Sequence, residues 1–175
     1  TTDTTVAVTL TSVKNVCAVS DSTTLAEAAA AATSGETIKI AAGTYDITAD
    51  NLLYKFKAGV TFEGAVDASG KPSTVFNVTL TGSGGLSIDD GATLKNMKFN
   101  VTSVGTNAEV FSAYNAFTMD NCEVVLSAGS ADTAGYAYVF DRTTNLKAAS
   151  ITNCVFTDNT TGTAPTWVVG FPYAN

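Results

Sequence analysis

Three short stretches of the chain, "TLKNMKFNV" (residues 93–101), "TMDNCEVVL" (118–126) and "SITNCVFTD" (150–158), follow one pattern. An aliphatic residue is followed by a polar residue, an asparagine and then a methionine or cysteine. A polar or small residue and a phenylalanine or valine complete the pattern. The shared asparagines, each with the residue after it, are Asn96 with Met97, Asn121 with Cys122, and Asn153 with Cys154.

A second family of short motifs alternates with the first along the chain. Its members are "VFN" from Val75, "VFS" from Val110, "VFD" from Val139 and "VVG" from Val168. The two families interleave at steps of roughly 25 to 35 residues, a period that indicates a solenoid of repeated units. No repeat has a helical period and the leucine-rich spacing is absent, so the pattern predicts a parallel β-helix with two or three short strands per coil.

Stacking of coils explains why the repeats share residue types. Equivalent inward side chains in successive coils lie about 4.8 Å apart and form continuous columns. We expect Asn96, Asn121 and Asn153 to form a ladder that satisfies backbone groups at a bend. Met97, Cys122 and Cys154 then form one rung of the core, in which a polarizable apolar side chain fills a narrow space. In-register neighbours point their Cβ atoms alike, so the cysteines are predicted to be free thiols.

The first 35 residues read differently from the repeats. Val6, Val8 and Leu10 alternate with threonine, so residues 1–21 are predicted to form an N-terminal strand segment. Residues 22–175 form the second unit: a helix at about 24–33 that caps the coils, and the coils themselves. Thr24 and Glu27 are spaced as a capping box, and a Ser-Gly pair follows the alanine-rich interior.

The segment "TTLAEAAAAATSGETIKIAAGTYDI" resembles the entry of right-handed parallel β-helix proteins of the pectate-lyase-like superfamily. In those proteins an alanine-rich capping helix leads through a glycine turn into a first strand that ends in Gly-Thr-Tyr, here Gly43-Thr44-Tyr45. The Asn-Cys turns at Asn121 and Asn153 resemble the asparagine ladders of the same superfamily. The resemblance covers about residues 22–172 and implies an all-β, right-handed parallel β-helix. It implies little about activity, because the superfamily contains lyases, hydrolases, phage spikes, adhesins and inert structural proteins.

Composition and charge exclude several classes of protein. Hydrophobic residues make up 45% of the chain and charged residues only 14%, which is not a disordered composition. The net charge of −7 and the absence of a basic cluster disfavour nucleic acid as a partner. No apolar run is long enough to span a membrane, and no signal peptide is visible. Three acceptor patterns for N-glycosylation favour a mature extracellular or cell-surface chain, and they begin at Asn77, Asn100 and Asn159.

Catalytic constellations are missing. The chain has no histidine and no Cys-x-x-Cys, which removes the commonest general base and structural zinc. The resemblance implies that a lyase would need several carboxylates around Ca²⁺ and a basic residue, but only Asp141 with Arg142 fits. The pair Asp89-Asp90 precedes a glycine and is typical of a turn. "GAVDASGKPS" (residues 64–73) departs from phosphate-loop spacing and is predicted to be a loop. We therefore expect no catalytic residue, cofactor or metal.

The favoured function is a non-enzymatic extracellular structural or adhesive subunit of a filament, surface layer or phage fibre. Other copies of the chain are the expected partners, because the last coil lacks a cap like the one before the first. The expected contact joins a C-terminal set to an N-terminal strand of another copy, and these residues are Trp167, Val168, Val169 and Phe171 with Val6, Val8 and Leu10.

Two alternatives remain open. A carbohydrate-binding or polysaccharide-degrading β-helix could use a face of aromatic and polar residues, with Tyr114, Tyr136, Tyr138, Trp167 and Tyr173 in the later coils. The 175 residues could also be one fragment of a longer protein whose remaining coils carry an activity.

Overall fold

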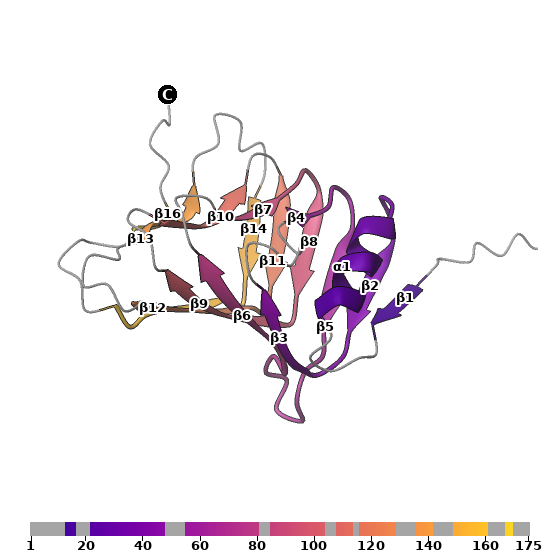
Figure 1. The fold of residues 1–175 in the computed structure, drawn as a ribbon, viewed down its shortest axis with the longest axis horizontal. Coiled ribbons are helices and arrows are strands. Elements are labelled where there is room, and N and C mark those ends of the chain that lie inside the picture. The colour runs from indigo at the N-terminus through magenta and orange to yellow at the C-terminus, as the bar shows by residue number, and fades with distance from the viewer. Residues whose placement is uncertain are drawn as a thin grey trace, which may run out of the picture.

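The computed structural model describes residues 13–16, 22–47, 55–80, 85–103, 108–113, 116–128, 136–141, 149–160 and 167–169. The described chain is all-β apart from one short helix, and its strands form three parallel sheets (Figure 1). This confirms the predicted all-β class and the parallel pairing of the strands. The predicted strand at Val6, Val8 and Leu10 lies outside the described residues, and β1 (Val13–Val16) follows it.

From β2 onward each sheet takes every third strand of the chain, and β1 adds to sheet A beside β2. Sheet A has the order β1 (Val13–Val16), β2 (Thr37–Ile40), β5 (Thr61–Gly64), β8 (Ala92–Lys95), β11 (Phe117–Asp120) and β14 (Ala149–Thr152). Sheet B has the order β3 (Gly43–Ile47), β6 (Thr74–Leu80), β9 (Met97–Ser103), β12 (Glu123–Ala128) and β15 (Val155–Asp158). Sheet C has the order β4 (Lys55–Phe56), β7 (Leu86–Ile88), β10 (Ala108–Ala113), β13 (Tyr136–Asp141) and β16 (Trp167–Val169).

From β2 onward the chain visits sheets A, B and C in turn, and we call three consecutive strands of this kind a triplet. The first triplet is β2–β3–β4 and the last is β14–β15–β16. Each strand pairs in parallel with its equivalents in the neighbouring triplets, an arrangement compatible with a β-helix-like solenoid.

Inward side chains of equivalent strands form the core. Tyr45, Phe76 and Phe99 occupy one register position in sheet B and are fully buried. Their rings lie 5.6 Å and 5.4 Å apart, and Phe99 also meets the ring of Phe111 from sheet C at 5.2 Å. Buried aromatic side chains contribute roughly 1.5 to 3 kcal/mol each by leaving water, so this column is a main source of stability.

Helix α1 (Ser22–Ala31) closes the N-terminal end of the core. Leu25, Ala29 and Ala32 are buried in the same cluster as the inward strand residues, and the helix lies against β1, β2 and β3. The helix begins two residues earlier than predicted, so the predicted capping box at Thr24 is wrong: Thr24 lies inside the first turn. An alanine-rich sequence gives little signal for the exact start of a helix, because alanine is favourable at every interior position.

The register reproduces the first repeat family and corrects the second. Thr93, Thr118 and Ser150 are aligned in sheet A, as the repeat predicts. Phe111 of "VFS" and Phe140 of "VFD" are aligned in sheet C. The motif "VFN" from Val75 is different, because it belongs to β6 of sheet B and its Phe76 aligns with Phe99. Three residues are too few to identify a sheet when all three sheets present alternating apolar positions.

The loop between β5 and β6, residues 65–73, projects from the corner of sheets A and B. Asp67 holds it with one carboxylate oxygen, which accepts hydrogen bonds from Ser69 N at 2.8 Å and Lys71 N at 3.0 Å. The carbonyl oxygen of Gly70 accepts a hydrogen bond of 3.0 Å from Asn121 Nδ2, two triplets further on. The loop predicted for "GAVDASGKPS" is therefore present.

Candidate functional site

The three repeated asparagines lie at the corner where strands of sheet A turn into sheet B. Asn96, Asn121 and Asn153 have φ values of 57°, 49° and 54°, and no other non-glycine residue of the described chain has a positive φ. A side chain in this left-handed conformation normally costs about 1 to 2 kcal/mol, and asparagine tolerates it best because its amide can hydrogen-bond locally. The need for a left-handed turn explains the residue type at this corner.

The side chains bring two of the three asparagines together. Asn121 Nδ2 donates to Asn96 Oδ1 at 2.9 Å, and the backbone N–H of Asn96 donates to the carbonyl of Asp120 at 3.1 Å. Asn153 Nδ2 instead donates to Asp120 Oδ1 at 2.9 Å. The ladder therefore changes at its last described step, where a carboxylate takes the place of an amide.

Asp120 is held as a carboxylate at this step. Its Oδ1 accepts hydrogen bonds from Thr152 Oγ1 at 2.7 Å and from Asn153 Nδ2. These hydrogen bonds lower the pKa of Asp120 below its ordinary value, with a smaller contribution from the charge of Lys95. The acid thus links two triplets while it is ionised.

The residue after each asparagine turns inward. Met97 and Cys122 are fully buried, and Cys154 in the last described triplet is half-buried. Register places Thr74 at the same position one triplet before Met97. The predicted rung of Met97, Cys122 and Cys154 is therefore one continuous column, which begins with a threonine.

Three members of this column also donate hydrogen bonds to carbonyl groups of sheet A in the preceding triplet. Thr74 Oγ1 donates to Ile40 O at 3.2 Å, Cys122 Sγ to Leu94 O at 3.7 Å, and Cys154 Sγ to Met119 O at 3.6 Å. Cys154 Sγ also contacts the carbonyl of Thr152 at 3.1 Å. In the sequence, methionine and cysteine at this position suggest only that the side chain fills space. The threonine at the equivalent position, Thr74, is the residue whose hydroxyl indicates a hydrogen-bond donor.

Cys122 and Cys154 are free thiols, in agreement with the prediction; Cys17 lies outside the described residues. The interaction between the two thiols and burial raise the pKa of Cys122, while the same interaction lowers the pKa of Cys154 to about 7. The half-buried Cys154 is therefore the more reactive thiol of the pair.

A second corner, between sheets C and A, is built from glycine and was missed in the sequence. Gly35, Gly59 and Gly91 have φ values of 88°, 67° and 72°. They occupy equivalent positions before β2, β5 and β8, and Gly35 N donates to Gly59 O at 2.8 Å. The recurrent Gly-x-Thr at these positions would have been the signal.

Two of the three glycosylation acceptor patterns lie side by side on the outward face of sheet B. Asn77 and Asn100 are aligned, and Asn100 Nδ2 donates to Asn77 Oδ1 at 3.1 Å. Asn77 Nδ2 in turn donates to Asp46 Oδ1 at 3.0 Å. Asn159 is exposed after β15. Asn77 and Asn100 therefore extend a polar ladder outside the core.

The predicted assembly residues are only partly described. Residues 167–169 form β16, the edge strand of sheet C, where Trp167 pairs with Tyr138 of β13 and Val169 with Phe140. Val6, Val8, Leu10 and Phe171 lie outside the described residues.

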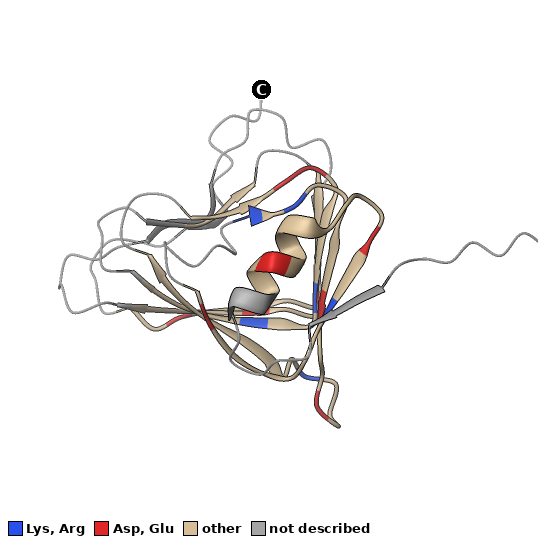
Figure 2. Ribbon diagram, turned by 45° about the vertical axis from the view of Figure 1, so that its right-hand side comes forward, with Lys and Arg blue, Asp and Glu red and all other residues tan. Residues whose placement is uncertain are grey.

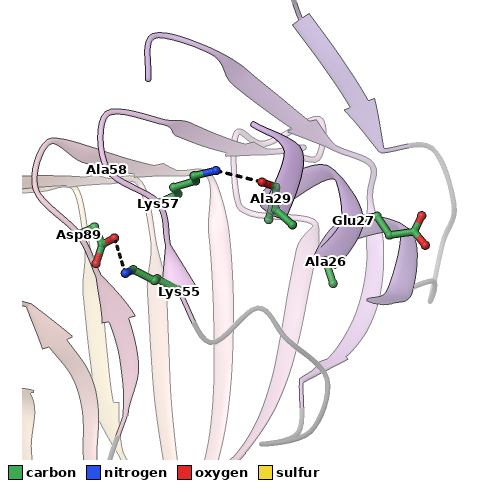
Figure 3. Close-up of a pocket in the computed structure, with 8 residues that line it drawn as sticks. Ala26, Glu27, Ala29, Lys55, Lys57, Ala58 and Asp89 are labelled. Carbon is green, nitrogen blue, oxygen red and sulfur yellow. Dashed lines mark hydrogen bonds and ion pairs between the residues drawn. The ribbon is translucent and has the colours of Figure 1, made fainter. Parts of the chain in front are cut away.

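A cleft of about 740 Å³ lies beside α1, at the end of sheet C formed by β4 (Figure 3). Alanine methyl groups form much of its wall, and two lysines lie on the side of β4. Lys57 Nζ donates to the carbonyl of Ala30 at 2.9 Å, and Lys55 Nζ lies 3.0 Å from Asp89 Oδ2. Glu27 points away from both lysines. The charged groups on the β4 side are thus already paired within the chain.

The acidic residues considered for catalysis are separated in space or paired. Asp89 binds Lys55, and Asp90 leads into the turn at Gly91, as predicted. Asp141 ends β13, and Arg142 lies outside the described residues. Across the described ranges, no three histidine, cysteine or acidic side chains are grouped as a metal site, and no helix there is long and apolar enough to cross a membrane.

Comparison of the chain with known proteins does not identify a family. The chain matches no family model, no curated protein and no solved structure.

Proposed function

We propose that the chain is a non-enzymatic structural or adhesive subunit with a right-handed parallel β-helix fold of the pectate-lyase-like kind. Three features support the fold: the cyclic visit to three parallel sheets, the alanine-rich helix at the N-terminal end, and the asparagine corner. The outward face of sheet A presents threonine, serine and charged residues, as expected of a solvated scaffold.

The observation that carries the proposal is the contrast between the two ends of the core. Leu94, Met119 and Ile151 occupy one inward position in successive triplets. Leu94 and Met119 are fully buried, whereas Ile151 is 36% exposed. On the outward face of the last strand of sheet B, Val155 is 56% exposed and adds an apolar side chain beside the open edge. In the described chain α1 covers the first triplet, and apolar residues of the last triplet meet solvent.

An open strand edge beside exposed apolar residues favours pairing with another strand. We infer that another copy of the chain supplies it by strand addition. Trp167, Val168, Val169 and Phe171 then meet the N-terminal segment with Val6, Val8 and Leu10. Such a head-to-tail contact does not close on itself, so it produces a filament or a layer.

The proposed location is extracellular or on the cell surface. Support comes from the acceptor patterns at Asn77, Asn100 and Asn159, of which Asn77 and Asn159 are exposed. Mass measurement of the natural material tests it, because glycosylation adds mass at those positions.

The test of assembly is sedimentation velocity of the full chain over a range of concentrations. We expect open-ended growth in the unmodified chain and a marked loss of large species in Val155→Lys. Val66→Lys is the matched control, because Val66 is also an exposed valine, 44% exposed, but lies in the loop of residues 65–73. A chain that stays monomeric and soluble at high concentration contradicts the proposal. Release of unsaturated products from acidic polysaccharides, abolished by Arg142→Ala, would replace it with polysaccharide degradation.

A further inference from the structure

The outward face of sheet A carries two regular columns that the repeats alone do not reveal. One column consists of hydroxyl residues, and register aligns Thr37, Thr61, Thr93, Thr118 and Ser150. The other column alternates in charge across four adjacent strands, and register aligns Lys39, Glu63, Lys95 and Asp120.

The charged column is partly open to solvent. Lys39 Nζ lies 3.4 Å from Glu63 Oε2, with side chains 54% and 30% exposed. The backbones that carry neighbouring charges are about 4.8 Å apart, the spacing of paired strands. In the described chain, α1 lies on the core side of this sheet, with Leu25 and Ala29 buried among the inward residues. Figure 2 shows basic and acidic positions side by side on neighbouring strands of one sheet.

We propose that this face binds the same face of a second copy, about a two-fold axis that runs along the strands between β5 and β8. Such an axis keeps the strand direction and reverses the strand order. Lys39 then faces Asp120 of the second copy, and Glu63 faces Lys95 of the second copy. Both contacts occur twice, so all four charges of each copy meet an opposite charge, and the hydroxyl columns face each other.

The alternation of charge also selects this alignment of the two copies. A shift by one strand places lysine against lysine and acid against acid, which is unfavourable. A shift by two strands restores opposite signs but leaves half of the charges without a counterpart. The pattern plus, minus, plus, minus is therefore complementary to its own reverse in one best alignment.

The size of the patch predicts a weak contact. Four strands of four residues cover roughly 19 Å by 13 Å, which is far below the roughly 800 Å² per partner of a stable interface. The contact should accordingly be reversible and sensitive to salt. It is additional to the proposed end contact, and it becomes effective when several copies joined end to end present the same face repeatedly.

The test exchanges the first two charges. Lys39→Glu with Glu63→Lys gives the order minus, plus, plus, minus, in which every pair across the two-fold axis has like charge. Net charge is unchanged, and the pair within the chain is kept in reversed form. The matched control is Lys98→Glu with Glu123→Lys, which exchanges a pair 3.3 Å apart on the outward face of sheet B.

Sedimentation equilibrium at low ionic strength (about 20 mM) measures the result, with the uncharged substitution Val155→Asn present in every variant to suppress growth at the ends, because Val155 is aligned with Glu123 and a charge there would disturb the control. We expect a monomer–dimer equilibrium in the parent and the control, and at least about tenfold weaker dimerisation in the exchanged variant. Circular dichroism checks that each variant is folded. Equal dimerisation of the exchanged variant, or a parent that stays monomeric, overturns the proposal.

A second measurement does not depend on any exchanged residue. Dimerisation of the parent should weaken strongly when salt is raised to about 500 mM, since screening acts on exposed charges. A salt-independent dimer overturns the face contact. The end contact is judged separately, by open-ended growth of the chain that retains Val155.

Discussion

The two described corners of the molecule both need a backbone with positive φ, and they use different residues for it. At the corner of sheets A and B, Asn96, Asn121 and Asn153 adopt positive φ and add hydrogen bonds through their side chains. At the corner of sheets C and A, Gly35, Gly59 and Gly91 adopt positive φ and connect only through the backbone. The asparagine corner links triplets through side chains, whereas the glycine corner allows the backbones of neighbouring triplets to approach closely.

The largest expected effect is at Gly64, which occupies the position of the asparagine one triplet before Asn96. Gly64 lies at the end of β5, and a Cβ there would be 2.3 Å from Asn96 O and 2.8 Å from Thr74 Cβ. Because backbone cannot move aside cheaply, Gly64→Ala should cost about 3 kcal/mol of the free energy of unfolding, measured by urea denaturation. A loss below about 1 kcal/mol would show that the corner can relax.

The glycine corner contains a matched pair of test positions. In Gly59→Ala, positive φ adds strain and the new Cβ meets Ser34 Oγ at 2.2 Å, whereas Gly91→Ala meets nothing closer than 3.7 Å. We expect losses of about 2 to 3 kcal/mol and about 1 kcal/mol, respectively, in the same assay. Ser34→Ala should remove much of the difference. Equal losses would mean that the positive φ alone, and not the contact with Ser34, determines the cost of a side chain at this corner.

Asn121 separates backbone strain from side-chain bonding at the asparagine corner. Asn121→Gly keeps the left-handed turn and loses the bonds to Asn96 and Gly70, at a cost of about 1 kcal/mol. Asn121→Ala loses both contributions and should cost about 2 to 3 kcal/mol. If Asn121→Gly costs as much stability as Asn121→Ala, the lost side-chain hydrogen bonds account for the effect and the positive φ contributes little.

Asp120 gives the asparagine corner a dependence on pH. Its folded pKa is lowered, so its contribution to stability is complete above the ordinary value of 3.8 and is lost as pH falls through the folded value. Asp120→Asn should therefore be less stable than the parent at pH 6, and the difference should shrink as pH falls below 3.8. Urea midpoints at pH 6 and over the acidic range measure it, and a constant difference would exclude the carboxylate as the cause.

The smallest effect is a difference in reactivity between the two thiols that follow this corner. In the folded chain, iodoacetamide should modify Cys154 faster as pH rises through about 7, while the buried Cys122 stays protected. After denaturation without reductant, Cys17, Cys122 and Cys154 should all be labelled. Peptide mass mapping measures both states, and a disulfide between Cys122 and Cys154 would contradict the free thiols.

The sequence predicts the asparagine corner well because its pattern is unusual. Asparagine followed by cysteine or methionine is rare enough to align three triplets, and the structure gives the same register. Glycine at the other corner is one of many glycines in the chain, so Gly59 and Gly91 do not stand out without the threonine two residues later.

The remaining features depend on distances that a repeat pattern does not contain. The pattern does not separate "VFN" from "VFS" and "VFD", because sheets B and C both carry buried phenylalanine. The alternating charges of sheet A stay hidden because the loops between successive strands differ in length. The donor role of Cys122 and Cys154 depends on a carbonyl one triplet away, which local sequence does not indicate. Handedness, location and the residues outside the described ranges stay predictions.

The loop of residues 65–73 bears on how the molecule unfolds. A linear array of repeats contacts only nearest neighbours, so its ends can melt while its middle persists. The bond from Asn121 Nδ2 to Gly70 O bypasses the triplet that contains Asn96 and joins β5 of the second triplet to β11 of the fourth. The central triplets should therefore melt as one cooperative block, with fraying confined to those outside the span.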